Sequence, residues 1–438
     1  MNVAFFLDSY YPSVNGVITV VSQLKNEMEK MGNHAIIITV ESRPRKDRSI
    51  KEKDIYRVPA IQVPLPKMNG MYFGFTNTRK IVKILKENDI QIIHSHTEFS
   101  LGKAAYRAAK KLNIPCVATT HTMWEDYYRH YFICGNLIPV GIIRSAQRQF
   151  YRNFDAMINV SQKAHDYFNL PYMLPYIHSE IIPNAIDEKK FCNICYTQTE
   201  IDELRKKFSI KKTDKILLYT GRIVEEKRID ELYAIVASIV KDRDDVKAIF
   251  VGSGLREEAL KNKTLKDNLT DKIKFTGFVT WQEISEYYTI ADIFITASLS
   301  EMHSMTILES LTVGKPVVCR RDTSFTDTIF HGIDGYLADS DEEMKSYIIR
   351  IVDDENLRKS MGLKALEISR RFVLKNQVLK HLDFYREVIS RYWQSDILNL
   401  SFTEEKARNP QIFKNVAMTY KLKALRIKND IITKTRHL

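Results

Sequence analysis

Short apolar segments alternate with segments of helical periodicity along the first half of this chain. The apolar segments are rich in β-branched residues, and they read NVAFFLD, HAIIITV, IQIIHSH, PCVATTH and FDAMINV. Short, continuously apolar strands that alternate with helices are typical of a parallel sheet covered by helices. The pattern therefore predicts a Rossmann-like α/β domain over residues 1–180.

The alternation stops near residue 180 and then restarts. The charged stretch Asp187–Asp214 suits a hinge and a helix leading into a second domain, in which the strand candidates are KILLYTGR, VKAIFVGSG, IKFTGFV, DIFITAS and KPVVCR. We expect a second doubly wound domain over residues 181–375, then a helix over 376–393 and a basic tail over 394–438. A chain of 438 residues is long enough for two domains. Ligands of open α/β sheets bind at the carboxyl ends of the strands, so the two domains are expected to face a cleft.

Two glutamates eight residues apart lie in the second predicted domain. Glu301 follows the strand DIFITAS, and Glu309 lies about two turns inside the next predicted helix, which ends near Gly314. The N-terminus of that helix presents unpaired N–H groups that suit a diphosphate. Carboxylates on either side suit sugar hydroxyls. The segment favours a sugar nucleotide, and the alternative is a surface helix with two solvated glutamates.

Other polar residues stand where the cleft is expected. Gly16 lies between the first strand and its helix, where a missing side chain lets a phosphate approach the backbone. Arg222 and Lys227 follow KILLYTG, and their charges suit a departing diphosphate, a task that a metal performs in other enzymes. His121 ends the strand PCVATTH and is a candidate polar ligand. The segment Trp124–Tyr127 behind it combines aromatic and acidic residues and suits an amphipathic lip for an acceptor alcohol.

A zinc site is the alternative for His94-Ser-His96, because two histidines at a strand end bind zinc in barrel hydrolases. Such barrels need eight βα units in one domain, whereas this pattern breaks near residue 180. We therefore expect no metal at the site. The five cysteines are scattered and odd in number, which indicates a reducing cytoplasm, and Cys192 and Cys195 are interpreted as structural.

The net charge of +12 implies an anionic partner. No nucleic-acid motif is present, and no apolar run reaches the roughly 18 residues of a membrane span. Between residues 404 and 438, nine Lys or Arg residues face three Asp or Glu residues, with apolar residues interleaved. This segment is predicted to be an amphipathic helix on an anionic membrane, a basic solvated arm, or a helix packed on the domain.

Taken together, the motifs resemble those of retaining glycosyltransferases of family 4, which have the two-domain GT-B fold. The resemblance covers about residues 1–390, through PSVNGV, IIHSH, TTHT, IIPNAID, TGRIVEEK and SEMHSMTILESL. The resemblance implies a site for a sugar nucleotide. Gly16, Arg222, Lys227 and the backbone amides near Met305 and Thr306 would contact the donor phosphates. Glu301 would bind hexose hydroxyls, Glu309 would bind the ribose, and His121 would contact the transferred sugar. The family usually has glycine between the two glutamates, whereas this chain has Met302-His303-Ser304-Met305. The identity of the sugar therefore does not follow from the motif.

Within the family, HTMWEDYYRHY is similar to a segment of bacterial diacylglycerol glucosyltransferases, which transfer glucose from UDP-glucose to a lipid hydroxyl. The apolar segment PLPKMNGMYFGF, the spacing of Arg144, Arg148 and Arg152, and the basic tail fit a lipid acceptor.

We therefore expect a cytoplasmic, membrane-associated enzyme on the inner face of the cell membrane, with a metal-free front-face mechanism and no required cofactor. The alternatives are a polysaccharide, polyprenyl-linked or soluble acceptor, and a non-catalytic sugar-nucleotide or membrane-binding protein.

Overall fold

The computed structural model describes residues 1–13, 15–63, 71–132, 135–188, 191, 196–280 and 283–408, with side chains to residue 394. Residues 1–384 form one compact unit, and residues 385–438 belong to a second. Both sheets and the candidate site belong to the first unit.

The first sheet has seven parallel strands in the order β3-β2-β1-β6-β7-β8-β9. Its strands are β1 (Asn2–Leu7), β2 (His34–Val40), β3 (Ile55–Val58), β6 (Ile92–Ser95), β7 (Cys116–Thr120), β8 (Ala156–Asn159) and β9 (His178–Ile181). Its helices are α1 (Gly16–Lys30), α2 (Thr78–Glu87), α3 (Ser100–Leu112), α4 (Trp124–Tyr131), α5 (Val140–Tyr151) and α6 (Gln162–Phe168), with short 3-10 turns η1 (Arg45–Asp47) and η3 (Gly135–Leu137). The antiparallel pair β4 (Ala60–Gln62) and β5 (Tyr72–Gly74) is separate from this sheet.

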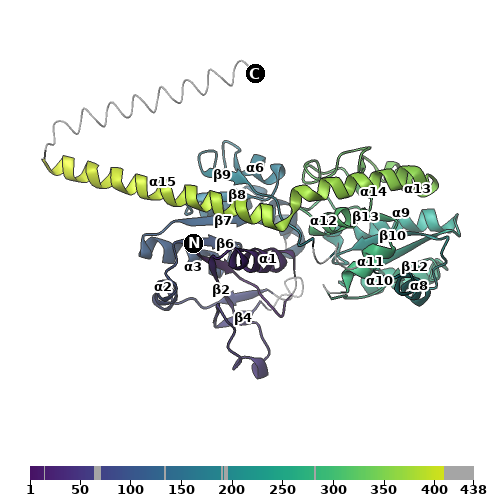
Figure 1. Ribbon diagram of the computed structural model, residues 1–438, viewed down its shortest axis with the longest axis horizontal. Helices are drawn as coiled ribbons and strands as arrows, with labels where there is room; N and C mark the ends of the chain where they lie inside the picture. Colours follow the sequence, from purple (N-terminus) through teal and green to yellow (C-terminus); the bar gives the residue numbers. More distant parts are fainter. Residues whose placement is uncertain are drawn as a thin grey trace, which may run out of the picture. The chain divides into compact units, whose positions relative to one another are not determined.

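The second sheet has six parallel strands in the order β12-β11-β10-β13-β14-β15. Figure 1 draws this part of the chain in teal to green. Its strands are β10 (Lys215–Thr220), β11 (Val246–Val251), β12 (Ile273–Phe275), β13 (Ile293–Thr296), β14 (Val317–Arg320) and β15 (Gly335–Ala338). The helical elements are α8 (Gln198–Lys207), η4 (Glu225–Lys227), α9 (Ile229–Lys241), α10 (Glu257–Lys266), α11 (Ile284–Ile290), α12 (Met305–Thr312), α13 (Asp341–Asp353), α14 (Glu355–Ser369), η5 (Arg370–Phe372) and α15 (Leu374–Arg408).

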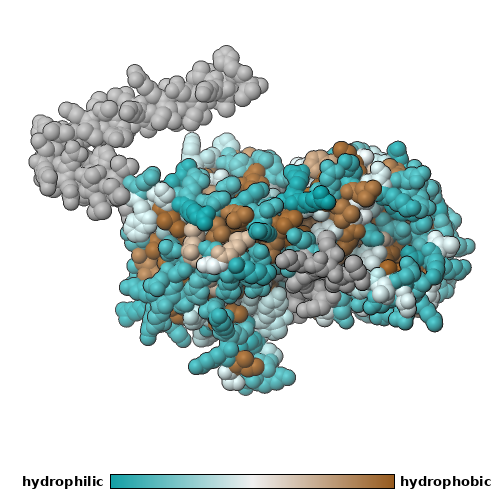
Figure 2. Space-filling view, in the orientation of Figure 1, coloured by the Kyte–Doolittle hydropathy of each residue, from teal (hydrophilic) through white to brown (hydrophobic). Residues whose placement is uncertain are grey.

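Both faces of the second sheet are buried under helices. Along β10, Ile216 and Leu218 pack in a core with α8, α11 and α12, whereas Leu217 and Tyr219 pack in another core with α9 and α13. Because side chains alternate between the faces of a strand, continuous apolarity requires cover on both sides. The face of the molecule in Figure 2 is mostly hydrophilic, with separate groups of apolar residues.

The predicted α/β architecture is confirmed, and the order of its strands is that of two doubly wound sheets. The helix that carries Glu309 begins later than expected, so Glu309 is its fifth residue, little more than one turn inside rather than two. No described helix is long and apolar enough to cross a membrane. The tail prediction falls largely on residues 409–438, which lie outside the described residues, as do Cys192 and Cys195. The domain boundaries near 180 and 375 stay an interpretation.

Candidate active site

A cavity of about 550 Å³ opens where strand ends of both sheets meet. The first sheet contributes the loops after β1, β6 and β7, and the second contributes the loops after β10 and β13. Seven of the eight predicted site residues line it, namely Gly16, His121, Arg222, Lys227, Glu301, Met305 and Thr306. The structure thus brings together residues that are far apart in the sequence, at the edge where open α/β sheets bind ligands.

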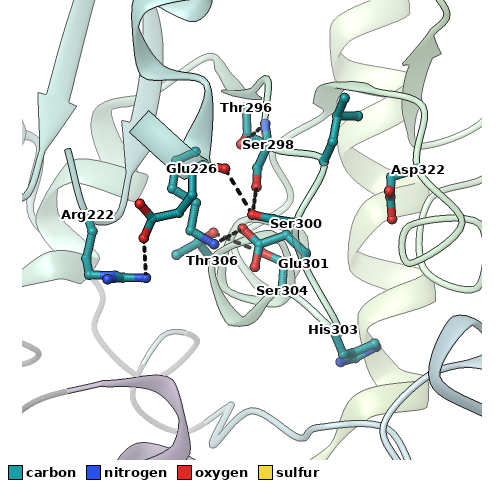
Figure 3. A network of polar contacts seen from close by, with 12 residues as sticks. Arg222, Glu226, Thr296, Ser298, Ser300, Glu301, His303, Ser304, Thr306 and Asp322 are labelled. Atoms are coloured by element: carbon teal, nitrogen blue, oxygen red, sulfur yellow. Dashed lines mark hydrogen bonds and ion pairs between the residues drawn. The ribbon is translucent and has the colours of Figure 1, made fainter. Parts of the chain in front are cut away.

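Lys227 and Glu301 form an ion pair in this cavity. The Lys227 Nζ lies 2.6 Å from the Glu301 Oε1, and the two side chains are 14% and 20% exposed. Burial is the largest single effect and lowers the pKa of Lys227, but its pairing with Glu301 and the neighbouring Tyr127 and Tyr219 together outweigh burial and raise the pKa. Burial likewise opposes ionisation of Glu301, but Lys227, with smaller contributions from Ser298 and Arg222, outweighs burial and lowers the pKa of Glu301. Both groups are therefore charged at neutral pH. The dashed lines at the Glu301 carboxylate in Figure 3 mark its polar contacts.

Arg222 lies at the same end of the cavity, directly after β10. Its Nη2 is 2.9 Å from the Glu226 Oε1, and its Nη1 donates to the Tyr131 hydroxyl at 2.7 Å. The Arg222 side chain is 53% exposed. The guanidinium therefore remains open to solvent on one side, where an anionic ligand can reach it.

Two helix N-termini border the cavity. α12 begins at Met305, and the side chain of Ser304, which precedes it, makes no capping hydrogen bond and instead contacts the Thr306 hydroxyl at 3.1 Å. α1 begins at Gly16, where an added Cβ would lie 3.8 Å from the Met305 Cγ. N–H groups and dipole ends of this kind form a site for a phosphate.

Glu309 does not belong to the described lining of the cavity. It is 5% exposed, and its Oε2 accepts a hydrogen bond from the Tyr288 hydroxyl at 2.7 Å. Tyr288 also lies 2.6 Å from the Thr220 Oγ1. The carboxylate is thus held behind the start of α12, and its contact with a ribose stays a prediction.

His121 borders the cavity at the end of β7. Its Nε2 lies 2.9 Å from the His96 Nδ1, and the ring centroid of His94 lies 3.9 Å from that of His96, with the two rings tilted by 39°. Burial lowers the pKa of His121 to about 3, so the imidazole is neutral. Among the described residues, the side chains grouped closely enough for a metal are Glu29, His34 and Asp54, away from these histidines. Within the part of the chain that the structure describes, His94 and His96 therefore belong to no cluster of side chains that could hold zinc.

The segment predicted to form an acceptor lip borders the cavity in part. Trp124 and Tyr127 line the cavity, as expected of its aromatic residues. Glu125 instead accepts a hydrogen bond from the Arg144 Nε at 2.8 Å, and Asp126 lies 3.4 Å from the Lys163 Nζ. The acidic residues of this segment are therefore bound to cations outside the described lining.

Sequence reasoning missed Glu98, which lines the cavity in the loop between β6 and α3. Burial raises its pKa to about 7, against hydrogen bonds that lower it, including one of 2.6 Å from the Tyr151 hydroxyl. Asp8 fixes this loop by accepting hydrogen bonds from the Thr97 hydroxyl at 2.6 Å and from the Leu101 N–H at 2.8 Å. The position of Glu98 just beyond a central strand was the available signal.

Apolar side chains from the β4–β5 pair and its flanks also line the cavity. They include Val63, Met71 and Phe73, and Phe99 lies nearby beyond β6. Phe73 is 53% exposed and Phe99 38%. The cavity is therefore charged where the second sheet borders it and partly apolar where the β4–β5 pair borders it.

Two family models match the chain. Residues 14–190 match the model described as Glycosyltransferase Family 4, and residues 200–367 match that of Glycosyl transferases group 1. The alpha-monoglucosyldiacylglycerol synthase of Streptococcus pneumoniae (strain ATCC BAA-255 / R6) is 31% identical, over 95% of this chain and 91% of its own length. The enzyme of the same name from Acholeplasma laidlawii is 27% identical, over 89% of this chain and 98% of its own length.

Solved structures show the same fold at lower identity. A sucrose-phosphate synthase from Thermosynechococcus elongatus superposes with a TM-score of 0.72 at 18% identity, over 89% of this chain and 99% of that chain. The HepE protein of Anabaena, in complex with UDP-glucose, has a TM-score of 0.68 at 18% identity, over 87% of this chain and 99% of that chain. The strand orders, the two family models and the full-length similarity agree, and this chain is a hexosyltransferase with the GT-B fold that belongs to glycosyltransferase family 4.

Proposed function

We propose that the protein transfers a glucosyl group from UDP-glucose to the free hydroxyl of diacylglycerol, with retention of the anomeric configuration. The proposal is supported by two relatives that are named as alpha-monoglucosyldiacylglycerol synthases and by a solved neighbour in complex with UDP-glucose. The observation that carries it is one continuous cavity with cations and a helix N-terminus on one side and apolar side chains on another.

The donor is assigned to the part of the cavity formed by the second sheet. In this assignment the diphosphate lies against the N-terminus of α12 and Gly16, with Arg222 and Lys227 beside it. Glu301 binds hexose hydroxyls, and Glu309 receives the ribose once the Tyr288 contact adjusts. Lys227 and Glu301 are 2.6 Å apart in the structure. On donor binding, a phosphate replaces Glu301 as the partner of Lys227, and a sugar hydroxyl replaces Lys227 as the partner of Glu301.

Transfer then proceeds on one face of the sugar. The bond between the anomeric carbon and the β-phosphate oxygen breaks, the acceptor oxygen bonds to the same face of that carbon, and its proton passes to the leaving phosphate. Arg222, Lys227 and the α12 N-terminus stabilise the charge on the departing UDP. His121, neutral and at the cavity wall, contacts the sugar. On this proposal turnover is unchanged when EDTA is added.

The acceptor is assigned to the apolar part of the cavity. Ile61, Phe73 and Phe75 on the β4–β5 pair are 55%, 53% and 53% exposed, and Phe73 also lines the cavity. Exposed aromatic residues beside a cavity suit contact with a lipid surface. We propose that this pair meets the inner face of the cell membrane, so that a lipid enters the cavity directly from the bilayer.

The basic face expected on α5 is only partly available. Arg144 is bound to Glu125 and lies over the Tyr172 ring at 5.4 Å, whereas Arg148 is exposed and donates to the Tyr172 carbonyl at 3.1 Å. Arg148 and Arg152 therefore remain for contact with anionic headgroups.

A transfer assay with a panel of UDP-sugars tests the function. Diacylglycerol in vesicles of phosphatidylglycerol, a polyprenyl phosphate and soluble sugars serve as acceptors, with and without EDTA. We expect glucosyl transfer from UDP-glucose to diacylglycerol in both conditions. Transfer only to a polyprenyl phosphate or to a soluble sugar would reject the lipid assignment, and loss of turnover with EDTA would reject the metal-free mechanism.

A further inference from the structure

A second, much smaller cavity lies beside His96 and His121. Its volume is about 20 Å³, and both histidines border it as well as the large cavity. Its other polar lining residues are Gln23 on α1, Gln377 and His381 on α15, Thr119 on β7, and Asn184. A space of this size holds about one water molecule.

Several polar atoms in the wall of this small cavity have no hydrogen-bond partner among the described residues. They are both amide atoms of Gln23, the Oε1 of Gln377 and the Nε2 of His96, on side chains whose residues are at most 7% exposed. The Nε2 of Gln377 donates to the Arg371 carbonyl at 2.8 Å, so its orientation is fixed. Buried polar atoms that lack partners are costly, and an ordered water is the usual remedy when they surround a cavity.

The contact between the two histidines carries one proton. A neutral imidazole has one N–H and one acceptor nitrogen, and a hydrogen bond between two of them needs one donor. Burial lowers the pKa of both His96 and His121, so both are neutral. If the His96 Nδ1 donates to the His121 Nε2, then the His96 Nε2 must accept; if it accepts, then the His96 Nε2 must donate. The group that bonds to the His96 Nε2 therefore decides whether the His121 Nδ1 carries a proton and donates, or lacks one and accepts.

We propose that Gln23 and Gln377 bind one water molecule against the His96 Nε2, and that this water holds His96, and through it His121, in a single tautomer. The Gln377 oxygen can only accept, so it accepts a hydrogen bond from one O–H of the water and restricts how the water meets His96. Gln23 and Gln377 are thus positioning residues, because neither belongs to the described lining of the large cavity. The consequence for catalysis rests on the proposed contact of His121 with the sugar.

The test is the tautomer of His121 in the free protein, read from ¹⁵N chemical shifts of the labelled imidazoles. Gln377→Met and Gln23→Met keep the side-chain length and remove the partners of the water. Gln147→Met is the matched control, because Gln147 is also buried and has an unpartnered Nε2 but belongs to α5. We expect one neutral tautomer in the wild type and in the control, and a mixture or the opposite tautomer in the two variants. Unchanged His121 shifts in both variants, with melting temperatures like that of the control, would overturn the proposal.

Glucosyl transfer gives the second readout. Loss of a buried hydrogen-bond partner is expected to lower kcat about tenfold in Gln377→Met, with an unchanged KM for UDP-glucose. A changed tautomer with unchanged kcat would support the water-linked network and reject the role of His121 in the proposed function. The two claims can therefore fail separately.

Discussion

Replacing Lys227 with methionine removes the cation of the buried pair and keeps most of the side-chain length. The carboxylate of Glu301, 20% exposed, is then left without the ammonium group that lies 2.6 Å away. Breaking a buried ion pair on one side typically costs about 3–5 kcal/mol, because the remaining charge is uncompensated. The lowered pKa of Glu301 is therefore expected to rise in this variant, since attraction to Lys227 is the main effect that lowers it.

Two separate losses are expected in function. The kcat of glucosyl transfer falls about 10²- to 10³-fold, the usual effect of losing one group that stabilises transition-state charge. Affinity for UDP falls about ten- to hundredfold, because one charge-assisted hydrogen bond is lost and an unpaired carboxylate faces the diphosphate. Isothermal titration with UDP and a radiolabelled transfer assay measure the two effects.

A double variant separates the loss of the Lys227 cation from the effect of leaving the Glu301 carboxylate unpaired. Lys227→Met with Glu301→Gln removes both charges, so it is expected to bind UDP more tightly than Lys227→Met alone but to remain as slow in transfer. Arg228→Met is the control, because Arg228 pairs with Glu231 and Asp341 and lies outside the described lining of the cavity. Turnover of Lys227→Met within about threefold of the wild type would refute leaving-group stabilisation by this lysine, since one such group is normally worth far more.

Three further predictions concern other parts of the unit. Burial lowers the pKa of His303 and of His381 to about 4, below the unfolded value, so their stabilising effect is complete above about pH 6.5 and is lost as the pH falls. We expect each histidine to account for about 2 kcal/mol of the stability lost between pH 7 and pH 5, measured by urea unfolding as the difference between the wild type and His303→Asn or His381→Asn, because Glu98, His96 and His121 also titrate differently in the folded protein. The same pH dependence in the wild type and both variants would contradict this. Glu309→Gln is expected to raise the KM for UDP-glucose about tenfold with a smaller change in kcat, measured by initial rates, and an unchanged KM would reject the ribose contact. Phe73→Ser with Phe75→Ser is expected to lower binding to anionic vesicles about tenfold while donor hydrolysis stays unchanged, and equal sedimentation of variant and wild type would reject the proposed membrane contact.

Regular elements were predictable where local sequence signals agree. Helix α2 (Thr78–Glu87) is an example, because Asn77 caps it and its apolar residues recur at helical spacing. The β4–β5 pair was not predicted as a hairpin, since strands of three residues carry too little periodicity to be recognised.

The site was predictable only in part. Lys227 and Glu301 are separated by 74 residues, and no local pattern shows that they form a pair. Their predicted proximity came from the resemblance of the motifs and from the general placement of ligands in α/β sheets. Glu125 was expected at the acceptor lip, but Arg144, 19 residues further along, binds it instead. Side-chain partners of this kind depend on packing, which periodicity does not encode.

The anomeric configuration of the product shows whether the acceptor attacks the face from which UDP departs. Wild-type protein is incubated with UDP-glucose and diacylglycerol in anionic vesicles, and the purified glycolipid is examined by proton NMR. We predict one glucosyl residue in α-linkage on the lipid hydroxyl, since the α-linked glucose of UDP-glucose keeps its configuration when the acceptor attacks from the side on which UDP departs. A β-linked product, or no glycolipid at all under conditions where UDP binds, would contradict it.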